Sequence, residues 1–214
     1  MVVMRKLAVI SFLSPLLFYS FAADGLYKAE PAGGPPSEVA AAMAQALQKD
    51  GTKISSNGAA YCEIWFRTQK PTGPKSTEEG VTLPLIPPGA LLGVIRFDGQ
   101  GADRRGQTIK PGVYTLRYGI MPVNGDHQGA APQRDFLLLS PAADDRDLNS
   151  TPGFEALVAM SRKASGTPHP AVLSFWKSDT DTAGFNKQGD TDWVLQTKIG
   201  DTPISVILVG VASS

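Results

Sequence analysis

The chain has 214 residues, of which 20 are Lys or Arg, 20 are Asp or Glu and 42% are hydrophobic. A formal net charge of zero lacks the positive surplus with which a nucleic-acid-binding protein attracts phosphates, so we expect no nucleic-acid partner. Glycine (22) and proline (17) are both frequent, but together they stay below the share typical of a disordered chain. The composition indicates one folded domain with many turns.

Residues 1–22 have the pattern of an export signal. Two basic residues, Arg5 and Lys6, come before an apolar run over 7–21, and the small residue Ala22 ends a cleavage site. The apolar run is short for a membrane-spanning helix, which needs about 20 residues. We therefore expect a cleaved signal peptide, with an uncleaved anchor as the alternative. The mature protein is expected to be soluble, secreted or periplasmic, and without a membrane span.

Removal of this signal changes the charge and leaves one cysteine. It takes away Arg5 and Lys6 and no acidic residue, so 20 basic groups become 18 against 20 acidic ones, and the mature net charge is about −2. Cys62 is too far from the cleavage site to carry a lipid anchor, and a single cysteine excludes an intramolecular disulfide. The folded state must therefore be stabilised by a packed core.

The next segment predicts a linker followed by a helix. Residues 23–36 are rich in Pro and Gly, a composition that favours an extended linker. Ser37 is a good N-cap residue, and apolar residues then recur at three- and four-residue spacing as far as residue 50. We therefore predict an amphipathic helix over 37–50, packed on a domain that comprises residues 51–214.

Beyond residue 51 the hydrophobic pattern is that of β-strands. In residues 60–67, Cys62, Ile64 and Phe66 alternate with mixed residues, which is typical of a half-buried strand. Apolar or alternating runs of this kind cover residues 60–67, 91–97, 113–121, 136–139, 171–176, 193–199 and 204–211. Turn-forming residues separate them, and one short helix is indicated over 153–163. The sequence predicts a mainly β fold: an antiparallel β-sandwich of about seven or eight strands, with one N-terminal helix and one short inserted helix.

Residues 109–116 read IKPGVYTL. This segment resembles the PG-x-Y-x-L turn and strand of transthyretin-like and carboxypeptidase-regulatory-like sandwich domains, and it is similar to a segment of exported bacterial domains without an assigned function. The Pro-Gly pair makes the turn, and Tyr114 and Leu116 enter the core side by side. The resemblance implies a sandwich with an adhesive, ligand-holding or assembly role, and it supplies no catalytic residue.

The densest group of polar residues that could carry chemistry lies around His127. Asp126, Arg134 and Asp135 are its neighbours in the sequence, and a histidine in a loop at the end of a sheet can act as a general base. The alternative is a solvated hairpin loop. Cys62 lies on the apolar face of its strand, where a thiol behaves as a small hydrophobe.

Three carboxylates suggest a calcium site. Asp179, Asp181 and Asp190 fall at positions 1, 3 and 12 of a loop of calcium-binding length, but the flanking segments read as strands and position 12 lacks the usual Glu. We expect either a calcium site outside the EF-hand class or a solvated acidic hairpin. No other cofactor is indicated.

Three aromatic residues are candidates for ligand contacts. Trp65, Tyr61 and Trp176 lie on the mixed faces of their strands, where aromatic rings can stack on sugars or anchor a protein partner. The alternative is that these rings belong to the core. We expect an exported, non-catalytic binding or assembly module for an unknown protein or carbohydrate ligand; the alternatives are an extracytoplasmic hydrolase that uses the His127 loop and a calcium-stabilised domain.

Overall fold

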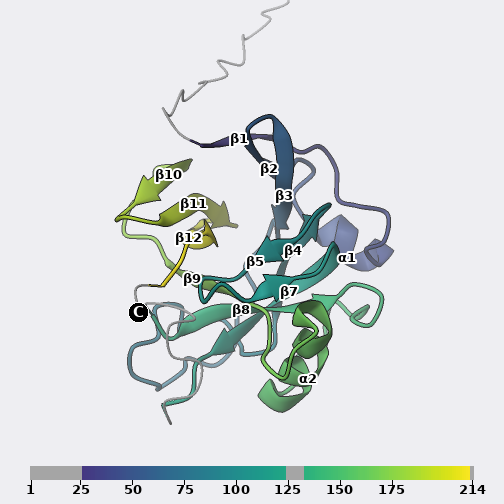
Figure 1. Cartoon of the computed structure of the whole chain (residues 1–214). Coiled ribbons are helices and arrows are strands. Elements are labelled where there is room, and N and C mark those ends of the chain that lie inside the picture. The colour runs from purple at the N-terminus through teal and green to yellow at the C-terminus, as the bar shows by residue number, and fades with distance from the viewer. Residues whose placement is uncertain (1–25, 124–132, 213–214) are drawn as a thin grey trace, which may run out of the picture.

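The structure is a computed structural model that describes residues 26–123 and 133–212. Ten strands form one antiparallel sheet in the order β1-β2-β3-β4-β7-β8-β9-β12-β11-β10 (Figure 1). Its strands are β1 (Tyr27–Pro31), β2 (Thr52–Ser56), β3 (Ala59–Phe66), β4 (Leu91–Phe97), β7 (Gly112–Ile120), β8 (Asp135–Pro141), β9 (Val172–Lys177), β10 (Gly184–Gln188), β11 (Asp192–Ile199) and β12 (Thr202–Val209). A small hairpin of β5 (Gly101–Ala102) and β6 (Thr108–Ile109) and two helices, α1 (Ala41–Ala46) and α2 (Phe154–Ser165), complete the fold.

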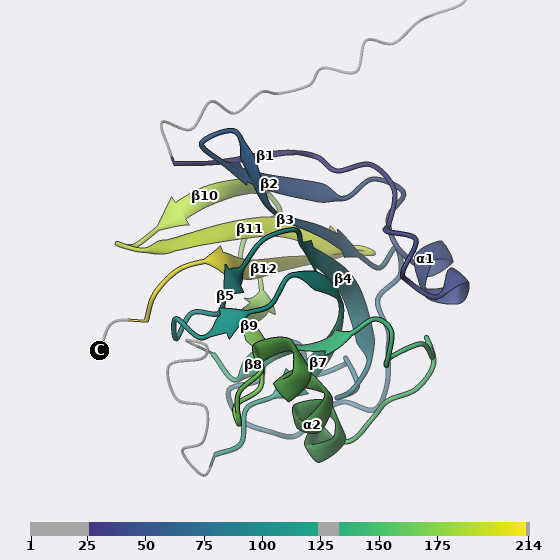
Figure 2. The same ribbon diagram turned by 45° about the vertical axis from the view of Figure 1, so that its right-hand side comes forward.

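The sheet curls until its first and last strands approach each other. In Figure 2, β1 and β2 lie directly above β10 and β11. Tyr27 of β1 contacts Trp193 of β11 edge to face, with ring centroids 5.4 Å apart. Within the ten-stranded sheet of the described residues, β1 and β10 are the two strands that have a neighbour on one side alone. The sheet is therefore barrel-like and almost closed, with a seam between β1 and β10.

The mainly β, antiparallel character of the fold and the two helices confirm the sequence-based prediction, whereas the two-layered sandwich of seven or eight strands is not confirmed. All seven predicted runs form strands. The sheet also includes β1, β2 and β10, each of which has one large apolar or aromatic residue: Tyr27, Ile54 and Phe185. Such strands lack an alternating pattern and form because their backbones pair with a neighbour. These extra strands make the sheet wide enough to curl round on itself.

The N-terminal region is more closely packed than the sequence suggests. Residues 27–31, inside the predicted linker, form β1 and pair with β2. The helix predicted over 37–50 is shorter, since α1 covers Ala41–Ala46, and Leu47 then forms a β-bridge with Arg67 of the barrel. Backbone pairing with the sheet therefore replaces both the free linker and the last turn of the helix.

The barrel interior is filled by side chains from alternate residues of the strands. In β7, Tyr114, Leu116 and Tyr118 belong to the interior cluster, whereas Thr115 and Arg117 lie on the outer face, as the alternation predicts. The Tyr114 hydroxyl also donates a hydrogen bond to the carbonyl of Lys110 (2.8 Å), which closes the Pro-Gly turn before β7. This local reading of the IKPGVYTL segment is confirmed.

The two helices cover the outer face of the sheet at separate places (Figure 2). Met43 of α1 packs with Trp65 and Val94, and Leu157 of α2 packs with Phe136. Each contact buries an apolar part of the outer face that would otherwise meet water. No helix in residues 26–123 or 133–212 is long and apolar enough to cross a membrane.

A buried ion pair holds the outer face of β7 against the loops before α2. The Arg117 guanidinium is fully buried and binds both carboxylate oxygens of Asp145, with Nη2 to Oδ1 at 2.7 Å and Nε to Oδ2 at 2.8 Å. It also donates to the carbonyls of Gly89, Asp147 and Ser150. This one side chain thereby ties two loops to the barrel: the one before β4, at Gly89, and the one between β8 and α2.

Gly89 allows this close approach. Its φ is +84°, in the left-handed region that glycine adopts without strain. A Cβ atom at this position would lie 2.5 Å from the carbonyl oxygen of Pro152, just before α2. A larger residue would therefore push apart the two loops that Arg117 holds.

We predict that Arg117→Met strongly destabilises the protein. The substitution leaves the Asp145 carboxylate buried without its cation, which typically costs about 3–5 kcal/mol. Urea unfolding followed by tryptophan fluorescence measures the loss. Lys163→Met is the control, because its pair with Asp144 is exposed and such pairs contribute about 0–1 kcal/mol. Equal stability of Arg117→Met and the unsubstituted protein would contradict the central role of this pair.

Candidate functional site

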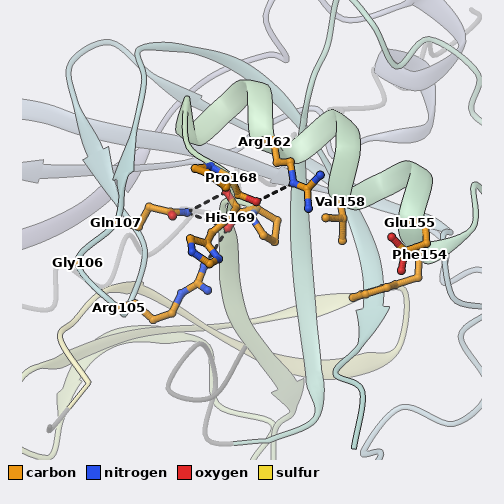
Figure 3. Close-up of a pocket in the computed structure, with 10 residues that line it drawn as sticks. Arg105, Gly106, Gln107, Phe154, Glu155, Val158, Arg162, Pro168 and His169 are labelled. Atoms are coloured by element: carbon orange, nitrogen blue, oxygen red, sulfur yellow. Dashed lines mark hydrogen bonds between the residues drawn. The ribbon is translucent and has the colours of Figure 1, made fainter. Parts of the chain in front are cut away.

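A cavity of about 820 Å³ lies beside α2 (Figure 3). Its walls come from three segments that are far apart in sequence: the turn between β5 and β6, one side of α2, and the stretch that leads into β9. The residues that line it are Arg105, Gly106, Gln107, Phe154, Glu155, Val158, Arg162, Pro168, His169 and Pro170. A volume of this size is typical of sites for small organic ligands.

The turn between β5 and β6 is built around a buried carboxylate. Asp103 Oδ1 accepts hydrogen bonds from the backbone N–H groups of Arg105 and Gln107, both at 3.0 Å. Asp103 Oδ2 binds the Arg105 guanidinium, with Nη2 at 2.7 Å. Because both carboxylate oxygens of Asp103 bind groups of this turn, they hold its backbone and the side chain of Arg105 in one conformation.

The segment before β9 is fixed by side chains that bind its carbonyls. Arg105 Nη2 and Gln107 Nε2 each donate to the carbonyl of Pro170 at 2.8 Å. Arg162 Nε donates to the carbonyl of Pro168 (2.7 Å), and Ser165 Oγ donates to that of His169 (2.6 Å). With its backbone held between two prolines, His169 presents an exposed side chain at the cavity.

The sequence of α2 explains which side of the helix faces the cavity and where its charged residues lie. Apolar residues at three- and four-residue spacing, among them Leu157, pack on β8 and leave the other side of the helix free. Gly166, in the left-handed conformation, ends the helix. Glu155 lies in the first turn and Arg162 in the last, where each charge is favoured by the helix dipole. The cavity wall therefore carries opposite charges at its two ends.

Positive charge is concentrated at one end of the cavity. Arg105 is compensated by Asp103, but Arg162 has no ion pair in the described residues. The terminal nitrogens of Arg162 likewise have no hydrogen-bond partner in that part of the chain, so their donors remain available. Figure 3 shows Arg105 beside His169, with Phe154 and Glu155 at the opposite end. Phe154 and Pro168 supply apolar surface, and the buried residues Val158 and Pro170 form the floor between them.

The chemistry of this lining favours binding. No Ser, Thr or Cys side chain is among the described residues that line the cavity, so His169 has no hydroxyl or thiol there to activate as a nucleophile. Guanidinium groups and prolines, in contrast, form a rigid surface with charge-assisted donors. The lining therefore combines donors suited to an anionic group with a rigid apolar surface.

The predicted cluster around His127 is described in part. His127 and Asp126 lie outside the described residues. Asp135 is fully buried and accepts hydrogen bonds from the backbone N–H groups of Thr82 (2.8 Å) and Leu83 (3.2 Å) and from the Tyr118 hydroxyl (2.5 Å). Asp135 thus anchors the long β3–β4 connection to the barrel.

Arg134 and Tyr118 complete this anchor. Arg134 forms an ion pair with Glu78 (Nη2 to Oε2, 2.7 Å) and donates to the carbonyls of Met121 and Glu79. Burial, together with the hydrogen bond to Asp135, raises the pKa of Tyr118. Arg134 therefore has structural partners on the β3–β4 connection, and the Tyr118 hydroxyl has its partner in Asp135.

The three aromatic candidates are not gathered into one surface. Trp65 is 1% exposed, packs under α1 and donates through Nε1 to the carbonyl of Gly33 (2.7 Å), which agrees with the alternative that this ring belongs to the core. Tyr61 is half-buried, its hydroxyl accepts from the N–H of Ala102 (3.3 Å), and burial raises its pKa to about 12. Trp176 is half-buried on β9, which β4, β7 and β8 separate from β3 in the sheet.

The three calcium candidates are also kept apart. Asp179 and Asp181 precede β10 and Asp190 follows it, so they lie at opposite ends of a strand about 13 Å long. Asp181 forms an ion pair with Lys198 (Oδ1 to Nζ, 2.7 Å). Within residues 26–123 and 133–212, no group of three or more His, Cys, Asp or Glu side chains is arranged to hold a metal ion. The strand β10 therefore separates the two ends of the loop in which the sequence places these carboxylates.

Sequence reasoning missed the residues that line the cavity. The rigid Pro168-His169-Pro170 stretch and the two arginines were visible, but nothing in the sequence shows that they meet. Arg105 and Pro170 are 65 positions apart and are brought together by the sheet. Comparison with protein-family models, with curated proteins and with solved structures finds no match.

We predict that calcium leaves the thermal stability unchanged. A bound ion present at 100 times its Kd would stabilise the fold by about 2.7 kcal/mol and raise the Tm by several degrees. Because the three carboxylates are separated, scanning fluorimetry in calcium chloride and in EDTA should give the same Tm. A higher Tm in calcium that Asp181→Asn abolishes would contradict this arrangement.

We predict that Cys62 is unreactive in the native protein. Its side chain is buried, and burial raises the pKa of the thiol above its ordinary value near 9. An aromatic disulfide reagent at pH 8 should label the protein after addition of denaturant and not before. Rapid labelling of the native protein would contradict the burial.

The raised pKa of Cys62 also sets a pH dependence. The stabilisation from the neutral thiol is complete below pH 9 and is lost as the pH rises beyond it, because the unfolded thiol then ionises first. The free energy of unfolding should therefore fall less steeply above pH 9 in Cys62→Val than in the unsubstituted protein.

Proposed function

We propose that this chain is an exported, non-catalytic binding module that holds a small molecule with an anionic group in the cavity beside α2. The observation that carries the proposal is the fixed arrangement of Arg105, Arg162 and His169 around one end of an 820 Å³ cavity. A guanidinium group binds a carboxylate or phosphate through charge-assisted hydrogen bonds in a planar geometry.

Preorganisation supports this function. The backbone on both sides of His169 is already bound by Arg105, Gln107, Arg162 and Ser165, so a ligand does not have to order it. Binding is favoured when side chains and loops lose little freedom on association. The apolar surface of Val158 and Phe154 suits a ligand with an apolar body next to its anionic group.

The predicted signal peptide supports the exported location, and the ligand-holding role implied by the resemblance agrees with a cavity of this kind. A carbohydrate or protein site formed by stacked aromatic rings has less support, since Trp65 is buried under α1. We therefore assign the binding function to the arginine-lined cavity.

The test uses phenylacetate, which has a carboxylate and an apolar ring, and phenylacetamide, which has the same shape without the charge. We expect phenylacetate to shift the NMR signals of His169 and Gln107 with a saturable titration, and phenylacetamide to shift them much less. Arg162→Gln should weaken phenylacetate binding about fivefold or more, because it removes an unpaired guanidinium from the cavity.

Lys163→Gln is the matched control, since it removes a neighbouring positive charge of α2 that does not line the cavity. It should leave the affinity for phenylacetate unchanged. Equal weakening by both variants, or the absence of saturable shifts with phenylacetate, would overturn the proposed function.

A further inference from the structure

The side of α2 that faces the cavity has a charge at each end and an apolar residue between them. Glu155, Val158 and Arg162 all line the cavity and follow one another at spacings of three and four residues, which places them along one stripe of the helix. Figure 3 shows Val158 between the other two side chains. A ligand that lies along this stripe meets a carboxylate, then an apolar surface, then a guanidinium.

Glu155 is free to bind a cation. It is exposed and forms no ion pair within the described residues, whereas Arg105, on the opposite side of the cavity, is paired with Asp103. The helix dipole accounts for an acidic residue in the first turn. It does not require this residue to line a cavity whose other end is positive.

The length of the stripe selects the size of the ligand. Glu155 and Arg162 are seven residues apart, which corresponds to about 10 Å along the helix axis. An extended peptide spans about 3.3–3.6 Å per residue, so three residues with free termini place an ammonium and a carboxylate about 10 Å apart. The backbone between these ends presents side chains that can contact Val158 and Phe154.

We propose that the ligand of this cavity is a short peptide of about three apolar residues with both termini free. Its carboxylate binds Arg162 and Arg105 beside His169, and its ammonium group binds Glu155. The apolar side chains of the peptide pack on Phe154 and Pro168, the more exposed apolar residues of the lining. This assignment rests on the proposed binding function and specifies the ligand of the same cavity.

The experiment compares three forms of one peptide by NMR titration: Ala-Val-Ala with free termini, N-acetyl-Ala-Val-Ala, which lacks the ammonium, and Ala-Val-Ala amide, which lacks the carboxylate. We expect the free peptide to bind about threefold to fivefold more tightly than the acetylated form, as suits an exposed ion pair. The amide should bind most weakly. Ala-Ala and Ala-Val-Ala-Val-Ala should bind less tightly than the tripeptide, because their termini do not match the stripe.

Two variants separate the roles of the ends. Glu155→Gln should make the free and the acetylated tripeptide bind equally, and Arg162→Gln should weaken both. Asp190→Asn, which removes an exposed carboxylate in the β10–β11 turn, is the control and should change neither affinity.

The outcomes distinguish this inference from the function on which it rests. If phenylacetate binds at Arg162 but the free tripeptide binds no better than the acetylated form, the peptide assignment is wrong and the anion-binding function stands. The peptide assignment is also wrong if Glu155→Gln keeps the preference for the free amine. If neither phenylacetate nor any tripeptide binds, both the anion-binding function and the peptide assignment are wrong.

Discussion

The buried pair of Arg117 and Asp145 is the interaction on which the position of the cavity beside α2 depends. Arg117 projects from the outer face of β7 and binds the loop that follows β8 through Asp145, Asp147 and Ser150. That loop leads directly into α2, which begins at Phe154. A buried guanidinium is tolerated only when all its donors have partners, so the loop has one geometry that satisfies it. The start of α2, and with it one wall of the cavity, is therefore set by a residue that does not touch the ligand site.

Two other carboxylates act in the same way at other loops. Asp103 shapes the β5–β6 turn through two backbone N–H groups, and Asp135 holds the β3–β4 connection through Thr82 and Leu83. Each is almost fully buried. A carboxylate in such a place must accept several hydrogen bonds, since a buried charge without partners is costly. A buried acidic residue therefore helps to hold each of these two connections, and neither contact requires a disulfide or a helical layer.

The need of buried polar groups for hydrogen-bond partners distinguishes the polar residues that the fold uses from those that remain available at the cavity. The polar residues that sequence reasoning singled out at Arg134 and Asp135 have their hydrogen-bonding capacity used by the fold, and Trp65 is covered by α1. The cavity beside α2 differs, because Arg162, Glu155 and His169 are exposed there on a backbone that is already fixed. Charge that the fold does not need, held on a rigid surface, is the arrangement expected of a binding site.

The sequence by itself determined the strands with a clear alternating pattern, the position of α2, the inward face of β7 and the burial of Cys62, because each depends on the periodicity of neighbouring residues. It did not determine β1, β2 or β10, which have one large apolar residue each and form through backbone pairing. The tertiary structure alone decided that the sheet curls into a barrel, and that Arg105 meets Pro170 at a distance of 65 positions. It also decided that an intervening strand separates Asp181 from Asp190. The physical reason is that contacts between distant segments depend on the order and curvature of the strands, which no local pattern records.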